Sequence, residues 1–222
     1  MMKAGNAQYT KLTDLPGEVA LFPLEGVLLL PNGYLPLNVF EERYLEMVED
    51  TMTGNRIIGI IQPHPEAQAD KKPELFKIGC LGRITNYSET GDGRLTIGLQ
   101  GICRFTFVEE CTTDKPYRIA KIHPFEKDLV AQKDDGRVDR ESLLNTFESF
   151  LEAHEMEADW GSIMQAPTTT LVNALSIVAP FGIAEKQALL EAEDTFTRAQ
   201  TLIALTERAL MFADNEEKPS LN

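Results

Sequence analysis

In the first part of the chain, short apolar runs alternate with turns rich in Gly, Pro and Asn. Within several of these runs apolar and polar residues alternate with a period of two, which is typical of β-strands. The pattern predicts six or seven short strands, at residues 19–24, 34–39, 56–62, 78–87, 95–99, 103–108 and 117–122. Strands of this length joined by hairpins favour a small closed or half-closed antiparallel barrel.

A helix is expected directly after the second strand. There the apolar residues recur at helical spacing and form one face, made of Tyr44, Leu45, Val48 and Met52. Gly54 and Asn55 are suited to end this helix. The β-rich part is therefore expected to span residues 17–126 and to include one helix.

Beyond a polar connection at residues 126–137 the apolar period changes from two to 3.6. Asp139 is suited to cap a helix whose apolar face is Leu143, Leu144, Phe147, Phe150 and Leu151. Further helices are expected at residues 159–164, 168–179, 185–191 and 194–213. The prediction is an α+β protein with a helical bundle at residues 138–213 and loose termini at residues 1–16 and 214–222.

The formal net charge is −14, and it is unevenly distributed. Residues 1–126 carry 13 Lys and Arg against 17 Asp and Glu, whereas residues 127–222 carry 8 against 18. Such a surface repels phosphate backbones and anionic membranes, so we expect neither nucleic acid nor a membrane as partner. The sequence shows no apolar run of the ~20 residues that a membrane helix needs and no signal-like N-terminus, which predicts a cytoplasmic protein.

Residues with reactive side chains do not form a recognisable catalytic or metal-binding pattern. The chain has three histidines and three cysteines at wide spacing, without Cys-x-x-Cys or His-x-x-x-His pairs. Neither a Gly-x-Ser-x-Gly elbow nor a phosphate-binding Gly-x-x-x-x-Gly-Lys loop is present. We therefore expect no catalytic residue, no metal and no cofactor, and reduced thiols at Cys80, Cys103 and Cys111.

Three ordered groups of residues resemble the LON substrate-binding domain, the N-terminal domain of Lon-type proteases that also occurs as a stand-alone bacterial protein. The first group is Leu21-Phe22-Pro23-Leu24, Leu30-Pro31, Leu35-Pro36-Leu37 and Asn38 to Tyr44, with Met47. The second is Ile78-Gly79-Cys80-Leu81-Gly82-Arg83-Ile84, and the third is Gly91-Asp92-Gly93-Arg94-Leu95 with Gly101-Ile102-Cys103-Arg104-Phe105. The helical part is also similar, through Asp159-Trp160, Leu171 to Leu175, Pro180-Phe181 and Glu185-Lys186-Gln187.

The resemblance implies a PUA-like β pseudobarrel followed by helices, and a role in recognising or positioning substrate proteins. Full Lon proteases add an ATPase module and a Ser-Lys protease module, for which 222 residues leave no room. We therefore expect a non-enzymatic module that binds unfolded or exposed protein segments and works with a protease partner.

The apolar loop at residues 27–34 is the first candidate for such binding, with Leu28, Leu29, Leu30 and Tyr34 as contact residues. An alternative is that these leucines fill the barrel. Glu41 and Arg43 are further candidates, which could equally form an ion pair between helix and barrel.

A second interpretation is that the barrel binds a small ligand or a modified nucleotide. Arg83, Arg94 and Arg104 would then face one opening of the barrel, although alternation along the strands also allows them to be solvated outward residues. A hydrolase with an unrecognised site is a third interpretation.

Overall fold

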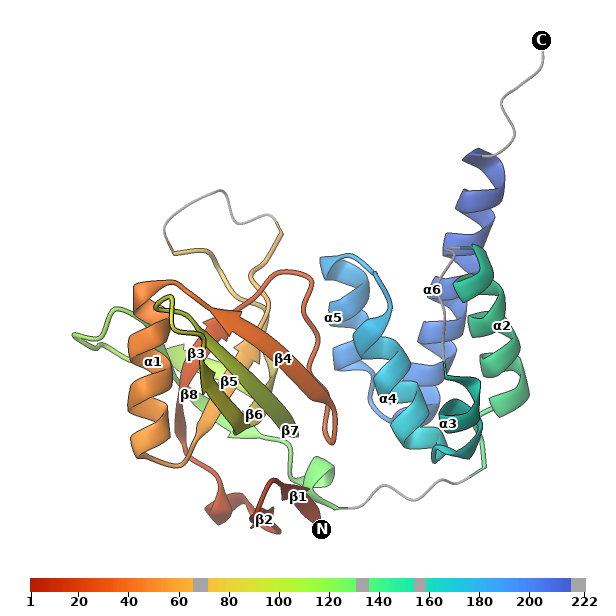
Figure 1. Ribbon diagram of the computed structural model, residues 1–222. Coiled ribbons are helices and arrows are strands. Elements are labelled where there is room, and N and C mark those ends of the chain that lie inside the picture. Colours follow the sequence, from red (N-terminus) through yellow and green to blue (C-terminus); the bar gives the residue numbers. More distant parts are fainter. Residues whose placement is uncertain (66–71, 131–135, 154–158, 217–222) are drawn as a thin grey trace. The chain divides into compact units, whose positions relative to one another are not determined.

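The computed structural model describes residues 1–65, 72–130, 136–153 and 159–216 (Figure 1). The chain divides into two compact units, which are described separately below. The β unit comprises Met1–Gln132 with Pro180–Leu190, and the helical unit comprises Lys133–Ala179 with Glu191–Asn222. The segment at residues 180–190, which the sequence assigned to the helical bundle, thus belongs to the β unit.

Among its described residues the β unit contains eight strands, two short 3₁₀ helices and two α-helices. In chain order the elements are β1 (Met2–Ala4), β2 (Ala7–Tyr9), η1 (Leu12–Asp14), β3 (Glu18–Pro23), β4 (Tyr34–Val39), α1 (Glu42–Thr53), β5 (Ile57–Ile61), β6 (Ile78–Glu89), β7 (Leu95–Glu110), β8 (Arg118–Pro124), η2 (Glu126–Leu129) and α5 (Ile183–Glu191). Two predicted strands, at residues 95–99 and 103–108, are one continuous strand, β7.

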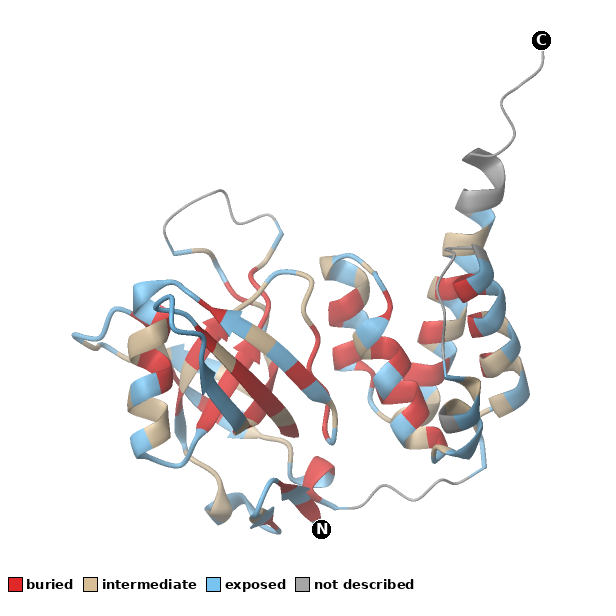
Figure 2. Ribbon diagram, in the orientation of Figure 1, coloured by how far each residue is buried: buried red, intermediate tan, exposed pale blue. Residues whose placement is uncertain are grey.

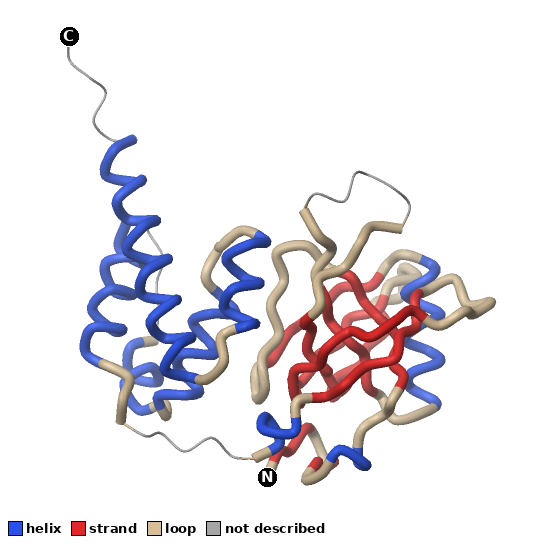
Figure 3. The backbone as a smooth tube through the Cα atoms, turned by 180° about the vertical axis from the view of Figure 1, so that it is seen from behind, coloured by secondary structure: helices blue, strands red, loops and turns tan. Residues whose placement is uncertain are grey.

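Six strands form one sheet in the order β4-β7-β6-β5-β3-β8, and a further pairing of β7 with β8 closes it into a barrel (Figure 3). The closure is possible because β7 is long and bulged. Its register shifts opposite Leu81/Gly82 and again between Phe107 and Glu109, and such bulges bend a strand. The α+β class and the closed sheet agree with the prediction.

The sheet is mixed, which corrects the expectation of a purely antiparallel barrel. β3 and β5 pair in parallel, with Ala20 opposite Ile58 and Phe22 opposite Ile60. Parallel neighbours need a long crossover connection, and here β4 and α1 lie between the two strands in sequence.

The N-terminal residues are part of the core, in contrast to the expected loose arm. β1 and β2 form an antiparallel hairpin whose Met2, Ala4 and Tyr9 side chains are buried among the barrel residues. The amide of Gly5 donates to Oε1 of Gln100 on β7 at 2.9 Å. With only a few apolar residues, this hairpin depends on the barrel for its burial.

Buried polar side chains connect α5 to the barrel. Gln62 Nε2 donates to the carbonyl of Ile183 at 3.2 Å and to Gln187 Oε1 at 3.1 Å. Gln187 Nε2 in turn donates to the carbonyl of Ile78 at 3.2 Å. These bonds satisfy polar groups that would otherwise destabilise the interior.

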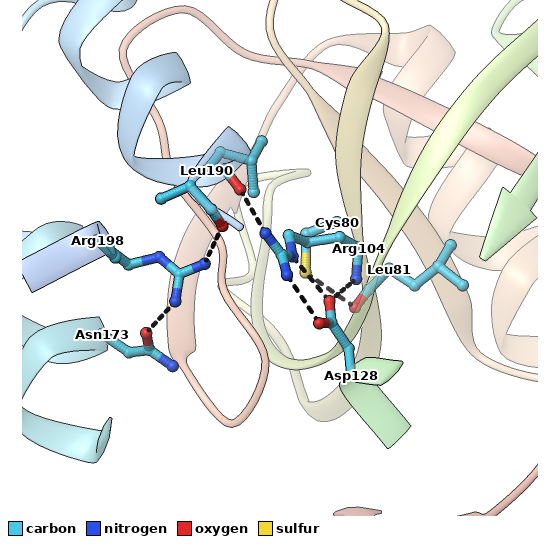
Figure 4. A network of polar contacts seen from close by, with 8 residues as sticks. Cys80, Leu81, Arg104, Asp128, Asn173, Leu190 and Arg198 are labelled. Atoms are coloured by element: carbon cyan, nitrogen blue, oxygen red, sulfur yellow. Dashed lines mark hydrogen bonds and ion pairs between the residues drawn. The ribbon is translucent and has the colours of Figure 1, made fainter. Parts of the chain in front are cut away.

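Arg104 is the largest buried side chain of the β unit, with 1% of its surface exposed. Its Nε and Nη2 donate to the two carboxylate oxygens of Asp128 at 2.8 and 2.9 Å, and its Nη1 donates to the carbonyl of Leu190 at 3.1 Å (Figure 4). The expectation of a solvated outward Arg104 is therefore wrong, because η2 returns across this part of β7 and supplies a carboxylate.

The helical unit consists of α2 (Arg140–Ala153), α3 (Trp160–Gln165), α4 (Thr168–Val178) and α6 (Thr195–Glu216). Its buried residues include most of the predicted apolar face of α2, namely Leu143, Phe147, Phe150 and Leu151, and on α4 Leu171 and Leu175. Val178 is 62% exposed at the end of α4. Residues 214–216 continue α6 where a loose tail was expected, and residues 217–222 lie outside the described part of the chain.

Two aspartates cap helices of this unit. The amide of Ser142 donates to Asp139 Oδ1 at 3.0 Å, which confirms the predicted cap of α2. The amide of Thr197 donates to Asp194 Oδ1 at 2.8 Å, and Arg137 Nη2 donates to its other oxygen at 2.9 Å. These donors lower the pKa of Asp194 to about 2.

Candidate binding surface

Leu28, Leu29 and Leu30 lie inside the β unit and are exposed by only 1%, 1% and 0%. The loop that carries them runs close to two glycines of the barrel. A Cβ atom at Gly101 would lie 2.0 Å from the carbonyl oxygen of Leu30, and one at Gly82 would lie 2.8 Å from Leu29 Cδ2. The leucines are therefore buried, with Leu29 and Leu30 packed against β6 and β7, and the hypothesis that they form an accessible binding surface is wrong.

Tyr34, in contrast, is 51% exposed at the start of β4. Buried and exposed segments alternate along this strand (Figure 2). Along this strand Leu35 and Val39 are buried, whereas Tyr34, Pro36 and Asn38 face outward. A Cβ atom at Gly98, two positions along β7 from Gln100, which lies opposite Tyr34, would lie 2.1 Å from the Tyr34 hydroxyl oxygen. The tyrosine ring therefore lies across β7, in space that only a glycine leaves free.

Neighbouring strands continue this surface with small polar residues. Thr96 Oγ1 on β7 donates to Asn38 Oδ1 at 3.2 Å, and Asn86 on β6 lies opposite Gly98. We name this surface the β4 face and define it by Tyr34, Pro36, Asn38, Asn86, Thr96 and Gly98. None of these residues is charged, although the chain as a whole has a net charge of −14. Phe40, 64% exposed, follows at the end of β4.

β4 is an edge strand of the six-stranded sheet. The amide of Gly101 donates to the carbonyl of Gly33, so by alternation Tyr34, Pro36 and Asn38 turn their backbone groups away from β7. Pro36 has no N–H to offer to a further strand, and a proline at such a position limits edge-to-edge pairing. The β4 face is therefore better suited to side-chain contacts than to strand addition.

Glu41 and Arg43 form an ion pair at 2.7 Å at the start of α1, with nearly half of each side chain exposed. The pair is local and does not join the helix to the barrel. The Arg43 guanidinium also lies 4.5 Å from the ring centre of Tyr44, which itself packs against Phe22 of β3 at 4.3 Å. Tyr44 thus anchors α1, and the exposed ion pair contributes no more than about 1 kcal/mol.

The three arginines of the small-ligand interpretation do not meet. Arg83 donates to the carbonyl of Asn55 at 2.7 Å, and Arg94 pairs with Asp92 in the exposed hairpin turn. Arg104 is buried against Asp128. Their different environments give no common opening of the barrel.

Reactive groups of the described residues are buried or isolated. Burial raises the pKa of the Cys103 thiol to about 12, and burial lowers the pKa of Lys186 on α5 to about 8, but each side chain is enclosed. His64 packs against Phe76, His123 lies exposed on β8, and His154 is outside the described residues. Within the described ranges no group of His, Cys, Asp and Glu side chains is placed to hold a metal ion, and no helix is long and apolar enough to cross a membrane.

Relatives of this chain are found among Lon proteases. The Lon protease of Dictyoglomus thermophilum is 27% identical over 213 residues, which cover 89% of this chain and 25% of that protein. Lon protease 2 of Myxococcus xanthus is 24% identical over 199 residues, covering 88% and 24%. The chain thus spans about a quarter of the length of these curated relatives.

Two solved structures share the fold. The crystal structure of a Lon N-terminal domain protein from Xanthomonas campestris matches with a TM-score of 0.60 and 23% identity, over 84% of this chain and 97% of the other. The N-terminal domain of Mycobacterium avium complex Lon protease matches with a TM-score of 0.63 and 14% identity, over 86% and 98%. Both confirm the α+β architecture of a Lon N-terminal domain.

The sequence itself identifies the family. Residues 18–208 match the family model described as the ATP-dependent protease La (LON) substrate-binding domain. The match covers both the β-rich and most of the helical residues of the chain. This chain therefore belongs to the LON substrate-binding domain family.

Proposed function

We propose that this protein recognises other polypeptides, binding partly unfolded or exposed segments through the β4 face without catalysing a reaction. The observation that carries the proposal is Tyr34, which lies half exposed across Gly98 on a surface free of charge. Apolar side chains of an unfolded segment gain free energy by burial against such a surface.

The composition of the face suits varied clients. Tyrosine offers a large, rigid contact area at low entropic cost, and Asn and Thr side chains can donate to or accept from different backbone groups. The absence of charged residues on the face avoids the desolvation cost that a fixed charge imposes on a mismatched client. Selection would therefore favour exposed apolar residues rather than one sequence.

Membership of the LON family supports the same proposal, since the family is named for substrate binding. We infer a cytoplasmic protein that delivers or positions substrates for a Lon-type protease supplied by another chain. The acidic composition supports neither nucleic acid nor an anionic membrane as partner.

The proposal is tested with fluorescently labelled α-lactalbumin that has been reduced and carboxymethylated, which keeps it unfolded. We expect the full chain to bind it, and Tyr34→Asp to weaken binding by about tenfold or more, because a buried contact is replaced by a carboxylate. Tyr34→Phe should retain most of the affinity. Fluorescence anisotropy measures all three.

Leu12→Asp is the matched control, because Leu12 is an exposed apolar residue on η1, away from the β4 face in sequence. It should bind like the parent chain. Equal binding by Tyr34→Asp would exclude the β4 face. Turnover of ATP or of casein by the purified chain, abolished by a single substitution, would contradict a non-catalytic role.

A further inference from the structure

A hollow of about 510 Å³ lies in the β unit beside α1. Its lining residues are Pro23, Glu25, Arg43, Tyr44, Pro63, Pro73, Pro116, Tyr117 and Arg118. None of them belongs to the β4 face. The volume is in the range of pockets that take small ligands or single side chains.

The lining residues of the hollow are held in place by ring packing and hydrogen bonds. Tyr44 packs against Phe22, and the hydroxyl of Tyr117 donates to Asp50 Oδ2 at 2.6 Å. Arg118 donates through Nη1 to the carbonyl of Pro73 at 2.8 Å and through Nη2 to Glu110 at 3.0 Å. A ligand would thus meet a largely preformed surface.

The chemistry of the walls restricts the ligand. Four prolines offer rings and carbonyl groups but no N–H, and proline and tyrosine rings together suit extended, proline-containing peptides. The charged hydrogen-bond donors of the lining are guanidinium groups, which cannot accept. Arg43 binds Glu41 through Nε and Nη2, and this pair is exposed enough for a ligand to exchange with Glu41.

Charge gives the second restriction. The lining carries two arginines and one glutamate, in a chain whose net charge is −14. Both arginines already pair with carboxylates, Arg43 with Glu41 and Arg118 with Glu110. Only the Arg43 pair is nearly half exposed, so Arg43 is where the carboxylate of a ligand can exchange, while Glu25 disfavours a second acidic group nearby.

We propose that the hollow binds one acidic side chain of an extended, proline-containing polypeptide segment, with Arg43 as the partner of its carboxylate. The inference relies on the proposed function only for the polypeptide nature of the ligand. The hollow would add sequence preference to the nonselective β4 face.

The probes are two short peptides of Ser, Gly and Leu residues, one with a central Glu-Pro and the other with a central Gln-Pro. Their binding to the full chain is measured by isothermal titration calorimetry. We expect the glutamate peptide to bind about tenfold more tightly, as a charge-assisted hydrogen bond allows. Arg43→Gln should remove the difference. Arg94→Gln, which alters an exposed arginine of a hairpin turn, should preserve it.

Pro116→Glu is a second variant, because Pro116 is exposed and its replacement brings a carboxylate to the rim without emptying the core. It should weaken the glutamate peptide more than the glutamine peptide. Equal affinity of the two peptides for the parent chain would overturn the proposal. Displacement of the glutamate peptide by acetate at equal concentration would also overturn it, since the ligand would then be any small carboxylate.

The proposal for the β4 face and the proposal for the hollow can be overturned independently of each other. Tyr34→Asp should leave peptide binding at the hollow unchanged, and Arg43→Gln should leave binding of unfolded α-lactalbumin within about twofold. Equal affinity of the parent chain for the two peptides, with intact α-lactalbumin binding, would overturn the hollow alone.

Discussion

Two neighbouring segments of the β unit differ in how far their side chains are exposed to solvent. The loop at Leu28–Leu30 is fully buried, whereas the outward residues of β4, which begin four residues after Leu30, remain exposed. The difference lies in what each segment meets. Gly82 and Gly101 leave room for Leu29 and Leu30 to pack closely on β6 and β7, while Gly98 leaves room for the Tyr34 ring, which stays half exposed. Hydrophobic character alone therefore does not identify a binding surface in this family member.

The comparison is tested most strongly by truncating one residue of each segment. Leu29→Ala should lower the free energy of unfolding by about 2–5 kcal/mol, because it leaves a cavity in a closed core. Tyr34→Ala should lower it by less than about 1 kcal/mol, since half the ring is already solvated. Urea denaturation of both variants measures the difference. Similar losses would mean that Tyr34 is a core residue and not a contact residue.

Two glycine substitutions test how closely each segment packs on β7. Gly101→Ala should cost about 1–3 kcal/mol, because the new methyl group meets the backbone carbonyl of Leu30, which cannot turn away. Gly98→Ala should cost less than about 1 kcal/mol, since it meets only the end of the Tyr34 side chain.

The same pair has a functional readout. Gly98→Ala should displace the Tyr34 ring and change binding of unfolded α-lactalbumin, whereas Gly101→Ala at matched folded fraction should not. Thermal unfolding followed by circular dichroism sets the matched conditions. The opposite order of stability losses would contradict the packing described above.

The smallest effect is expected from salt. Binding at the uncharged β4 face should change by less than about twofold when NaCl is raised to about 0.5 M, because no ion pair is screened. Binding of the glutamate peptide at the hollow should weaken over the same range. A strong salt dependence of α-lactalbumin binding would show that charged residues outside the β4 face contribute.

Local patterns predicted much of the secondary structure. The period of two located the strands, and the period of 3.6 located the helices of both units. Asp139 was identified as a helix cap because its interaction is with an amide three residues away. Such features depend on neighbours in the sequence, so the sequence alone is sufficient.

Features that depend on distant residues were missed. Arg104 was expected outside, because its partner Asp128 is brought to it only when η2 packs on the barrel. The N-terminal hairpin was expected to be loose, since its few apolar residues are buried by β7 and not by one another. The parallel pairing of β3 and β5 likewise follows from the path of the chain through space.

The sequence by itself determined the α+β class, the approximate elements and, through ordered motifs, the LON family. Only the tertiary structure decided which apolar residues became surface, placing Leu28–Leu30 in the core and Tyr34 outside, and it alone brought two arginines, two tyrosines and four prolines around one hollow. The physical reason is that exposure is a property of the three-dimensional neighbourhood, which period and composition do not encode.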